Sequence, residues 1–184
     1  MKKENIALGV TVKLTLAVVF AALVFTVTSQ IPPIPIPATS GYFNVGETII
    51  YVAALLFGPF VGAFSGGTGA MLSDIYLGFG HFAPGTLIIK GVEGAIVGFV
   101  NIKLKKYIPN PTVRAIISVI VGGVEMVAGY FLYETLLAML FPSLEIFAIA
   151  EIPLNIVQML VGLIIAVPIM HAVLRIFPQL KSQI

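Results

Sequence analysis

Long apolar runs, separated by short polar or proline- and glycine-containing segments, fill most of the sequence. Runs of about 20 apolar residues are long enough to cross the hydrocarbon layer of a membrane as helices. The pattern predicts six helices, at about residues 6–29, 45–57, 60–77, 86–104, 112–140 and 152–176. The second and third could form one broken helix, but Gly58-Pro59 between them favours a tight reversal. We therefore expect an all-α bundle and one transmembrane domain that covers residues 1–184.

Composition supports a membrane protein. Of the 184 residues, 59% are hydrophobic and 10% are charged, and the mean hydropathy is +1.08. A soluble domain carries about one quarter charged residues, because its surface faces water. Cysteine is absent and there are two histidines, which we place at opposite ends of the bundle. We therefore expect no disulfide, no metal site and no bound cofactor.

The basic residues predict an orientation. With six spans, both termini share one side of the membrane with the loops after the second and fourth helices. Nine of the ten Lys and Arg residues fall on that side: Lys2, Lys3, Lys13, Lys103, Lys105, Lys106, Arg114, Arg175 and Lys181. The positive-inside rule then predicts cytoplasmic termini and a multi-pass protein of the plasma membrane. A cleaved signal peptide is the alternative for the start, but the apolar run is too long and lacks an Ala-x-Ala site.

Most polar side chains within the predicted helices fall in their outer halves. Because a charge in a membrane helix is costly, each one is a candidate functional residue. For Glu47, Glu134 and Glu151 the alternative is that they simply reach water. Lys90 and Glu93, spaced i, i+3, share a helix face and can neutralise each other, as a structural pair or as substrate contacts. Together these residues predict a polar cup that is open outward and sealed inward.

The outer loops add aromatic groups and a candidate lid. The segment Ile31–Pro37 contains four prolines and should form a stiff, polyproline-like strap without secondary structure. Aromatic side chains around the mouth suit a flat heteroaromatic ligand, although an interfacial aromatic belt is an equal alternative. The predicted substrate-binding residues are Tyr42, Phe43, Asn44, Glu47, His81, Lys90, Glu93 and Asn155.

Small residues recur at steps of four on three helices. On the third helix they are Gly62, Gly66 and Ala70, and on the fourth they are Gly94 and Gly98. Such stripes let helices approach closely, and for these two helices we expect packing within the chain. On the first helix, the stripe of Ala17 and Ala21 could also receive a helix of another protein.

Several segments resemble the S components of energy-coupling factor (ECF) transporters. They include Ala17-x-x-x-Ala21, Gly41-Tyr42-Phe43-Asn44-Val45-Gly46-Glu47, Phe57-Gly58-Pro59 and Leu87-Ile88-Ile89-Lys90-Gly91-Val92-Glu93-Gly94. The last two and the Gly-Tyr-Phe-Asn segment are similar to the riboflavin-type subfamily, which also includes proteins assigned to pyrimidine or pyridoxine-like precursors.

This resemblance implies a membrane subunit that captures a vitamin from outside. A transmembrane coupling (T) component and two ABC ATPase subunits would be its partners, and Ala17 and Ala21 would contact the coupling component. Riboflavin is the first choice of substrate, and a thiamine-pyrimidine or vitamin B6-like compound the second.

Two other classes of protein compete with this interpretation. A solitary carrier or channel would need polar groups through the inner half of the membrane, or a repeated half, and the sequence has neither. An intramembrane enzyme would need a catalytic motif, but Ala63-Phe64-Ser65-Gly66 lacks the first glycine of Gly-x-Ser-Gly and no His-Glu-x-x-His occurs. No phosphate-binding Gly-x-x-x-x-Gly-Lys-Ser/Thr loop occurs either. We therefore expect a protein that is not an enzyme and does not hydrolyse ATP itself.

Overall fold

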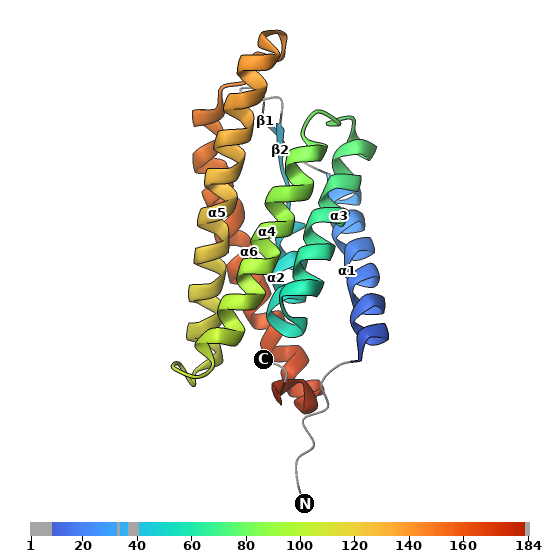
Figure 1. The fold of residues 1–184 in the computed structure, drawn as a ribbon, viewed down its shortest axis with the longest axis vertical. Helices are drawn as coiled ribbons and strands as arrows, with labels where there is room; N and C mark the ends of the chain where they lie inside the picture. Colours follow the sequence, from blue (N-terminus) through green and yellow to red (C-terminus); the bar gives the residue numbers. More distant parts are fainter. Residues whose placement is uncertain (1–8, 33, 37–40, 183–184) are drawn as a thin grey trace, which may run out of the picture.

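The computed structural model describes residues 9–32, 34–36 and 41–182, and this part of the chain forms a helical bundle with one small hairpin (Figure 1). The six α-helices are α1 (Val10–Gln30), α2 (Glu47–Phe57), α3 (Pro59–Leu77), α4 (Ala83–Leu104), α5 (Pro111–Leu140) and α6 (Ala148–Ile176). Two short 3₁₀ turns, η1 (Pro142–Leu144) and η2 (Pro178–Ser182), follow α5 and α6. The prediction of six helices is confirmed.

Three of these helices, α1, α5 and α6, are long and apolar enough to cross a membrane. The predicted boundaries are close to the observed ones, except that α1 begins four residues later than expected, and α4 and α6 begin three and four residues earlier. Pro84 lies in the first turn of α4, where its missing N–H costs little. Pro153 and Pro168 lie inside α6. Pro168 was inside the predicted helix as well, whereas Pro153 was expected in its first turn.

The chain reverses between α2 and α3, as Gly58-Pro59 predicted. Gly58 adopts a left-handed conformation, with φ of 87°, which glycine allows without strain. Pro59 then starts α3, because its fixed φ suits the first turn of a helix. The alternative of one broken helix is therefore wrong, and Figure 1 shows the two helices running in opposite directions.

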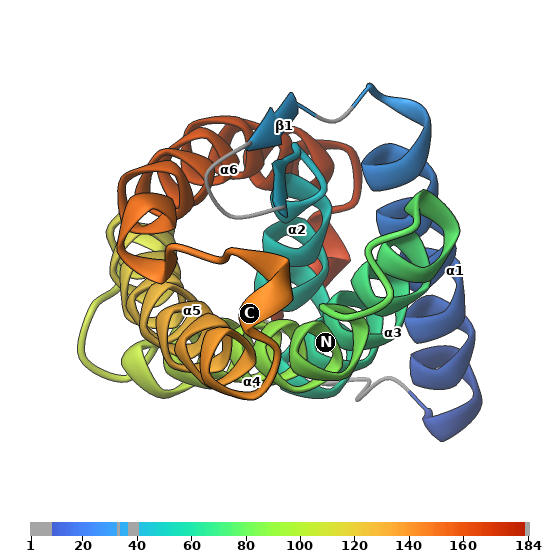
Figure 2. The same cartoon turned by 90° about the horizontal axis from the view of Figure 1, so that it is seen from above.

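The short helix α2 lies at the centre of the bundle. Nine of its eleven residues are buried, and it packs against α1, α3, α4 and α6. Seen from above, α3, α4, α5 and α6 surround it, and α1 lies at the edge against α3 (Figure 2). Because α2 is covered on all sides, polar groups on it meet protein rather than lipid.

Glycines bring α3 and α4 into close contact, as their small-residue stripes predicted. A Cβ atom on Gly62 would lie 2.6 Å from the carbonyl oxygen of Gly94, and one on Gly66 would lie 2.6 Å from that of Lys90. Real Cβ atoms do not approach so closely, so only glycine fits. This packing fixes the backbone of Lys90 against α3.

The alanines of α1, which we predicted to contact a coupling partner, pack inside this chain. Ala17 is 1% exposed and Ala21 is 7% exposed. Ala17 lies in a cluster with Ala53 of α2 and Val61 of α3. The outward face of α1 instead carries Leu14, Val18, Val19 and Leu23. In this structure the apolar face, and not the two alanines, is exposed on α1.

A two-stranded antiparallel hairpin replaces the strap that we expected without secondary structure. Strand β1 (Ile34–Ile36) pairs with β2 (Gly41–Phe43), with Pro35 opposite Tyr42. The proline-rich segment is tolerated because β1 is an edge strand, where a missing N–H breaks few ladder bonds. Pro33 and Pro37 lie outside the described residues.

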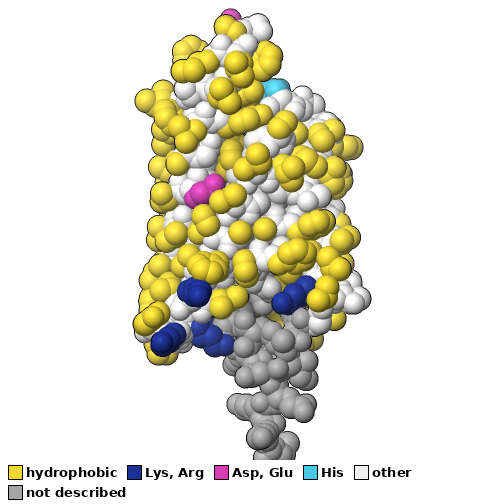
Figure 3. Space-filling view, viewed as in Figure 1, with side chains coloured by type: hydrophobic (Ala, Val, Ile, Leu, Met, Phe, Trp, Pro, Cys, Tyr) yellow, Lys and Arg dark blue, Asp and Glu magenta, His cyan; other side chains and the backbone are white. Residues whose placement is uncertain are grey.

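Basic residues gather at one end of the bundle (Figure 3). They lie at the start of α1 (Lys13), the end of α4 (Lys103, Lys105 and Lys106), the start of α5 (Arg114) and the end of α6 (Arg175). The hairpin lies at the other end (Figure 1). This segregation agrees with the predicted distribution of charge, although Lys2 and Lys3 are outside the described part of the chain.

Candidate ligand-binding site

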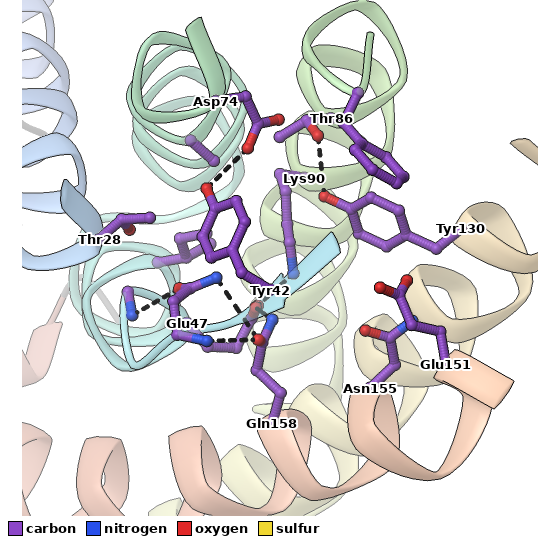
Figure 4. Close-up of a pocket in the computed structure, with 15 residues that line it drawn as sticks. Thr28, Tyr42, Glu47, Asp74, Thr86, Lys90, Tyr130, Glu151, Asn155 and Gln158 are labelled. Atoms are coloured by element: carbon purple, nitrogen blue, oxygen red, sulfur yellow. Dashed lines mark hydrogen bonds and ion pairs between the residues drawn. The ribbon is translucent and has the colours of Figure 1, made fainter. Parts of the chain in front are cut away.

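A cavity lies under the hairpin, away from the basic end, and every helix contributes to its wall (Figure 4). Its volume is about 40 Å³, room for about three or four water molecules. The lining residues are Thr28, Tyr42, Asn44, Gly46, Glu47, Ile50, Ala70, Asp74, Phe82, Thr86, Lys90, Tyr130, Glu151, Asn155 and Gln158. Eleven of these fifteen side chains can donate or accept a hydrogen bond, which is unusual between the helices of so apolar a chain.

Lys90 joins two buried carboxyl groups beside the cavity. Its Nζ forms an ion pair with Glu47 Oε2 and a second, at 3.2 Å, with Glu93 Oε2. Tyr51 donates a hydrogen bond of 2.8 Å to Glu93 Oε1. Glu47 is 1% exposed, Lys90 3% and Glu93 0%. The predicted i, i+3 pairing of Lys90 with Glu93 is therefore present, and Glu47 is a third member that the spacing alone did not reveal.

Gln158 links this cluster to the segment that follows the hairpin. Its Nε2 donates to Glu47 Oε2 at 3.0 Å, and its Oε1 accepts from the backbone N–H of Asn44 at 3.1 Å. Asn44 Oδ1 in turn accepts from the N–H of Gly46 at 2.9 Å, just before α2. These bonds connect α6, the start of α2 and the charged cluster, so a change in one should be felt by the others.

Two tyrosines form the upper wall. Tyr42 of β2 donates a hydrogen bond of 2.7 Å to Asp74 Oδ1 of α3, and its ring packs on Phe79 with centroids 4.6 Å apart. Tyr130 of α5 donates to Thr86 of α4 at 3.0 Å, and Lys90 Nζ lies 5.4 Å from the centre of its ring. Burial and the Asp74 carboxylate raise the pKa of Tyr42, so its hydroxyl remains a donor at neutral pH.

The cavity wall carries an excess of acceptors. Three carboxyl groups, of Glu47, Asp74 and Glu151, face one ammonium group, of Lys90. Glu47 Oε1 and Asp74 Oδ2 are buried without a hydrogen-bond partner among the described residues. Leaving a buried acceptor unsatisfied costs about 1–3 kcal/mol or more, so a ligand that offers N–H or O–H groups to these oxygens would be favoured.

The three glutamates that could have reached water are buried, so that alternative is wrong. Glu47, Glu134 and Glu151 are 1%, 0% and 5% exposed. Neither carboxyl oxygen of Glu134 has a hydrogen-bond donor within the described part of the chain. Glu151 lines the cavity, and Glu134 belongs to α5. Buried acidic side chains are therefore found both in the cavity wall and on α5.

Five of the eight predicted substrate-binding residues line the cavity: Tyr42, Asn44, Glu47, Lys90 and Asn155. Phe43 does not, because successive side chains of a strand point to opposite sides and Tyr42 takes the inner side. Glu93 lies behind Lys90 and contacts Tyr51 instead.

His81 also lies off the cavity wall, although its neighbour Phe82 lines it. The carbonyl oxygen of His81 accepts a hydrogen bond from Tyr133 at 2.8 Å. Its ring packs on that of Phe82 with centroids 4.6 Å apart. Burial lowers the pKa of His81, so the imidazole adds no positive charge near the mouth at neutral pH. No group of three or more potential metal ligands occurs in the parts of the chain with described coordinates.

Six polar residues of the cavity wall were not among the predicted substrate-binding residues: Thr28, Asp74, Thr86, Tyr130, Glu151 and Gln158. Asp74 and Gln158 did carry a signal, since both are polar residues in the outer part of an apolar helix. Thr86 and Tyr130 carried none, because threonine and tyrosine are common in membrane helices and only the packing of α4 against α5 brings them together.

The fold and the site define a class of protein, namely a helical membrane protein with a polar cavity near one end. Comparison with known proteins is more specific. The family model described as "ECF-type riboflavin transporter, S component" matches residues 10–175, and the chain belongs to this family. The family resemblance that the sequence motifs indicated is therefore confirmed.

Two relatives extend this finding. The chain is 34% identical to the thiamine precursor transporter HmpT of Lactococcus lactis subsp. cremoris (strain MG1363) over 155 residues, which are 84% of this chain and 82% of that protein. It is 44% identical to an uncharacterized protein in the gap 3′ region of Pyrococcus woesei over 105 residues, or 57% of this chain and 67% of that protein. A family of transporter components agrees with the expectation that the chain is not an enzyme.

Proposed function

We propose that this protein is the substrate-binding subunit of an ECF-type importer and that it captures a small amino-substituted heterocycle of the thiamine-precursor type. The acceptor-rich wall of the cavity carries this proposal. Glu47 Oε1 and Asp74 Oδ2 lack donors among the described residues, and an aminopyrimidine offers N–H groups to both. The wall also supplies aromatic faces for the pyrimidine ring, from Tyr42, Phe82 and Tyr130.

The volume of the cavity does not separate the candidate ligands. About 40 Å³ is room for a few water molecules, so even a single-ring ligand needs the hairpin or the wall to move. The similarity to a named thiamine precursor transporter supports the single-ring ligand. A vitamin B6-like compound, with one ring and several hydroxyl groups, is compatible with the same wall.

Riboflavin is the second candidate, because the matching family model carries its name. Its three-ring system has several carbonyl acceptors and one ring N–H, so only its ribityl hydroxyl groups offer further donors to the orphaned carboxyl oxygens. Binding would also need a wider opening of the site.

The proposal includes the orientation and the partners that the sequence predicted. Both termini would lie in the cytoplasm, with all six helices spanning the plasma membrane and the cavity near the outer face. The energy for uptake would come from two ABC ATPases, through a coupling component. The chain itself holds no phosphate-binding loop of the Walker type.

The experiment is a binding competition on the purified full chain. The hydroxymethyl aminopyrimidine precursor of thiamine, pyridoxine and riboflavin are titrated separately by calorimetry, and native mass spectrometry identifies any copurified ligand. We expect the aminopyrimidine to bind at least tenfold more tightly than riboflavin. A yellow preparation, or tighter binding of riboflavin, would refute the proposed substrate and favour the second candidate. If none of the three binds, the proposed vitamin-capture function itself fails.

A further inference from the structure

A second cavity lies at the basic end of the bundle, far from the first. Its volume is about 470 Å³, and it is formed by the turn after α4, the start of α5 and the end of α6. The residues that line it are Lys105, Pro109, Pro111, Arg114, His171, Leu174 and Arg175. Three are cationic, one is a histidine, and none of these described lining residues carries a carboxyl group. Charge of a single sign around a cavity favours an anionic ligand.

Arg114 is held in place without being neutralised. Its Nη1 donates to the carbonyl oxygens of Ile108 and Pro109 at 3.0 and 3.3 Å, and its Nε donates to Asn101 Oδ1 at 3.4 Å. These acceptors are uncharged, and no carboxylate within the described chain pairs with Arg114. Arg114 is 5% exposed. A buried guanidinium without a counter-charge is costly, so an anion in the cavity would stabilise it.

The second arginine reaches the same cavity from α6. Arg175 is exposed and forms no ion pair with a described carboxylate. His171, one turn before it, shares a hydrogen bond of 2.8 Å between its Nε2 and Thr112 Oγ1 of α5. This bond ties α5 to α6 and keeps the two arginines on one cavity. Guanidinium groups are well suited to phosphate, because they can donate two parallel hydrogen bonds.

Exposed apolar side chains adjoin these cations. Val113, next to Arg114, is 41% exposed, and Ile176 and Phe177, next to Arg175, are 69% and 49% exposed. A free phosphate ion would not use such a surface, whereas the acyl chains of a lipid would cover it. Basic pockets between membrane helices are known sites for anionic lipid headgroups. We propose that this cavity binds the phosphate of an anionic phospholipid, with its acyl chains against the adjoining faces of α5 and α6.

The test compares two charge-removing variants of the full chain. Arg175→Gln removes a cation from the cavity wall. Lys106→Gln removes an exposed cation at the same end that lies outside the cavity and over the ring of Tyr107. Native mass spectrometry measures the retention of phosphatidylglycerol and of phosphatidylcholine, with and without millimolar inorganic phosphate. We expect at least fivefold more phosphatidylglycerol than phosphatidylcholine on the natural chain, a loss of most of this preference in Arg175→Gln, and less than a twofold change in Lys106→Gln.

Three outcomes would overturn the proposal. Equal loss in both variants would mean a diffuse attraction to the basic end. Complete displacement of the lipid by inorganic phosphate would make a soluble anion the ligand. Unchanged lipid retention in Arg175→Gln, with weakened pull-down of a coupling protein, would make the cavity a protein-docking site. Arg114→Gln, checked for an unchanged unfolding temperature, tests the buried arginine by the same lipid measurement.

Discussion

Glu47 and Glu93 are both fully buried and both pair with Lys90, yet they occupy different positions relative to the cavity. Glu47 is part of its wall and has one oxygen without a donor among the described groups, whereas Glu93 lies behind Lys90 and accepts from Tyr51. Similar charges with similar burial can therefore have different roles. The pair offers a matched comparison of ligand contact with structural support.

We predict that Glu47→Gln weakens binding of the aminopyrimidine by about 10- to 100-fold, since a hydrogen bond to a charged group is worth about 1.5–3 kcal/mol. Glu93→Gln, which removes the same charge and keeps the side-chain shape, should change affinity less than about threefold, because it makes no ligand contact. Calorimetry of both variants checks this, with thermal unfolding to verify the fold. Equal losses would show that both residues act only through the charge of Lys90.

Helix α1 has two faces with different tasks. One face packs against α2 and α3 and includes Ala17 and Val24, and the other exposes Leu14, Val18, Val19 and Leu23. It packs mainly on α3 and lies at the edge of the bundle (Figure 2). An edge helix with an exposed apolar face is available for contact with another membrane protein, so the coupling surface that the family implies would lie on this face.

We predict that Ala17→Leu lowers the stability of the protein by about 1–3 kcal/mol, because extra methyl groups overpack a filled interface. Ala22→Leu makes the same substitution on the exposed side of α1 and should leave stability unchanged while it weakens assembly with the coupling protein. Thermal unfolding in detergent and pull-down with the coupling protein measure the two effects. Normal stability of Ala17→Leu, together with a selective loss of assembly, would restore the original assignment of the coupling surface to Ala17.

The bundle as a unit differs at its two ends. At one end the hairpin lies over a small acidic cavity, and at the other a basic rim surrounds a larger cavity. Tyr42 joins the hairpin to α3 through Asp74. We infer that a ligand enters from the hairpin end, past β2. The hydrogen bond between Tyr42 and Asp74 would then act as a latch, because it holds the hairpin against α3 over a bound ligand.

We predict that Tyr42→Phe raises the dissociation rate of the aminopyrimidine about tenfold and changes its association rate less than about twofold. The ring can still pack on Phe79, but the hydrogen bond to a carboxylate is lost, and the latch acts after encounter. Stopped-flow kinetics measures both rates. Tyr76→Phe, on the exposed side of α3 with Tyr76 64% exposed, is the matched control. An unchanged dissociation rate in Tyr42→Phe would mean that the hairpin is not a gate.

The helices and their order follow directly from the sequence. Apolar length, Gly58-Pro59 and the glycine stripes of α3 and α4 act between neighbours along the chain or along one helix face, so their consequences can be predicted without coordinates. The same holds for the family, because its motifs are continuous segments. The pairing of Lys90 with Glu93 is likewise local, since residues three apart on a helix face each other.

The cavity could not be predicted in the same way, because it depends on which helix faces meet. Glu47 and Lys90 are 43 residues apart and Gln158 is 111 residues from Glu47, yet all three form one cluster around the central helix α2. The inward position of Ala17 and the acidic wall that favours an N–H-bearing ligand both result from long-range packing. Local sequence patterns show that a residue is polar or small, but only the folded bundle determines what that residue contacts.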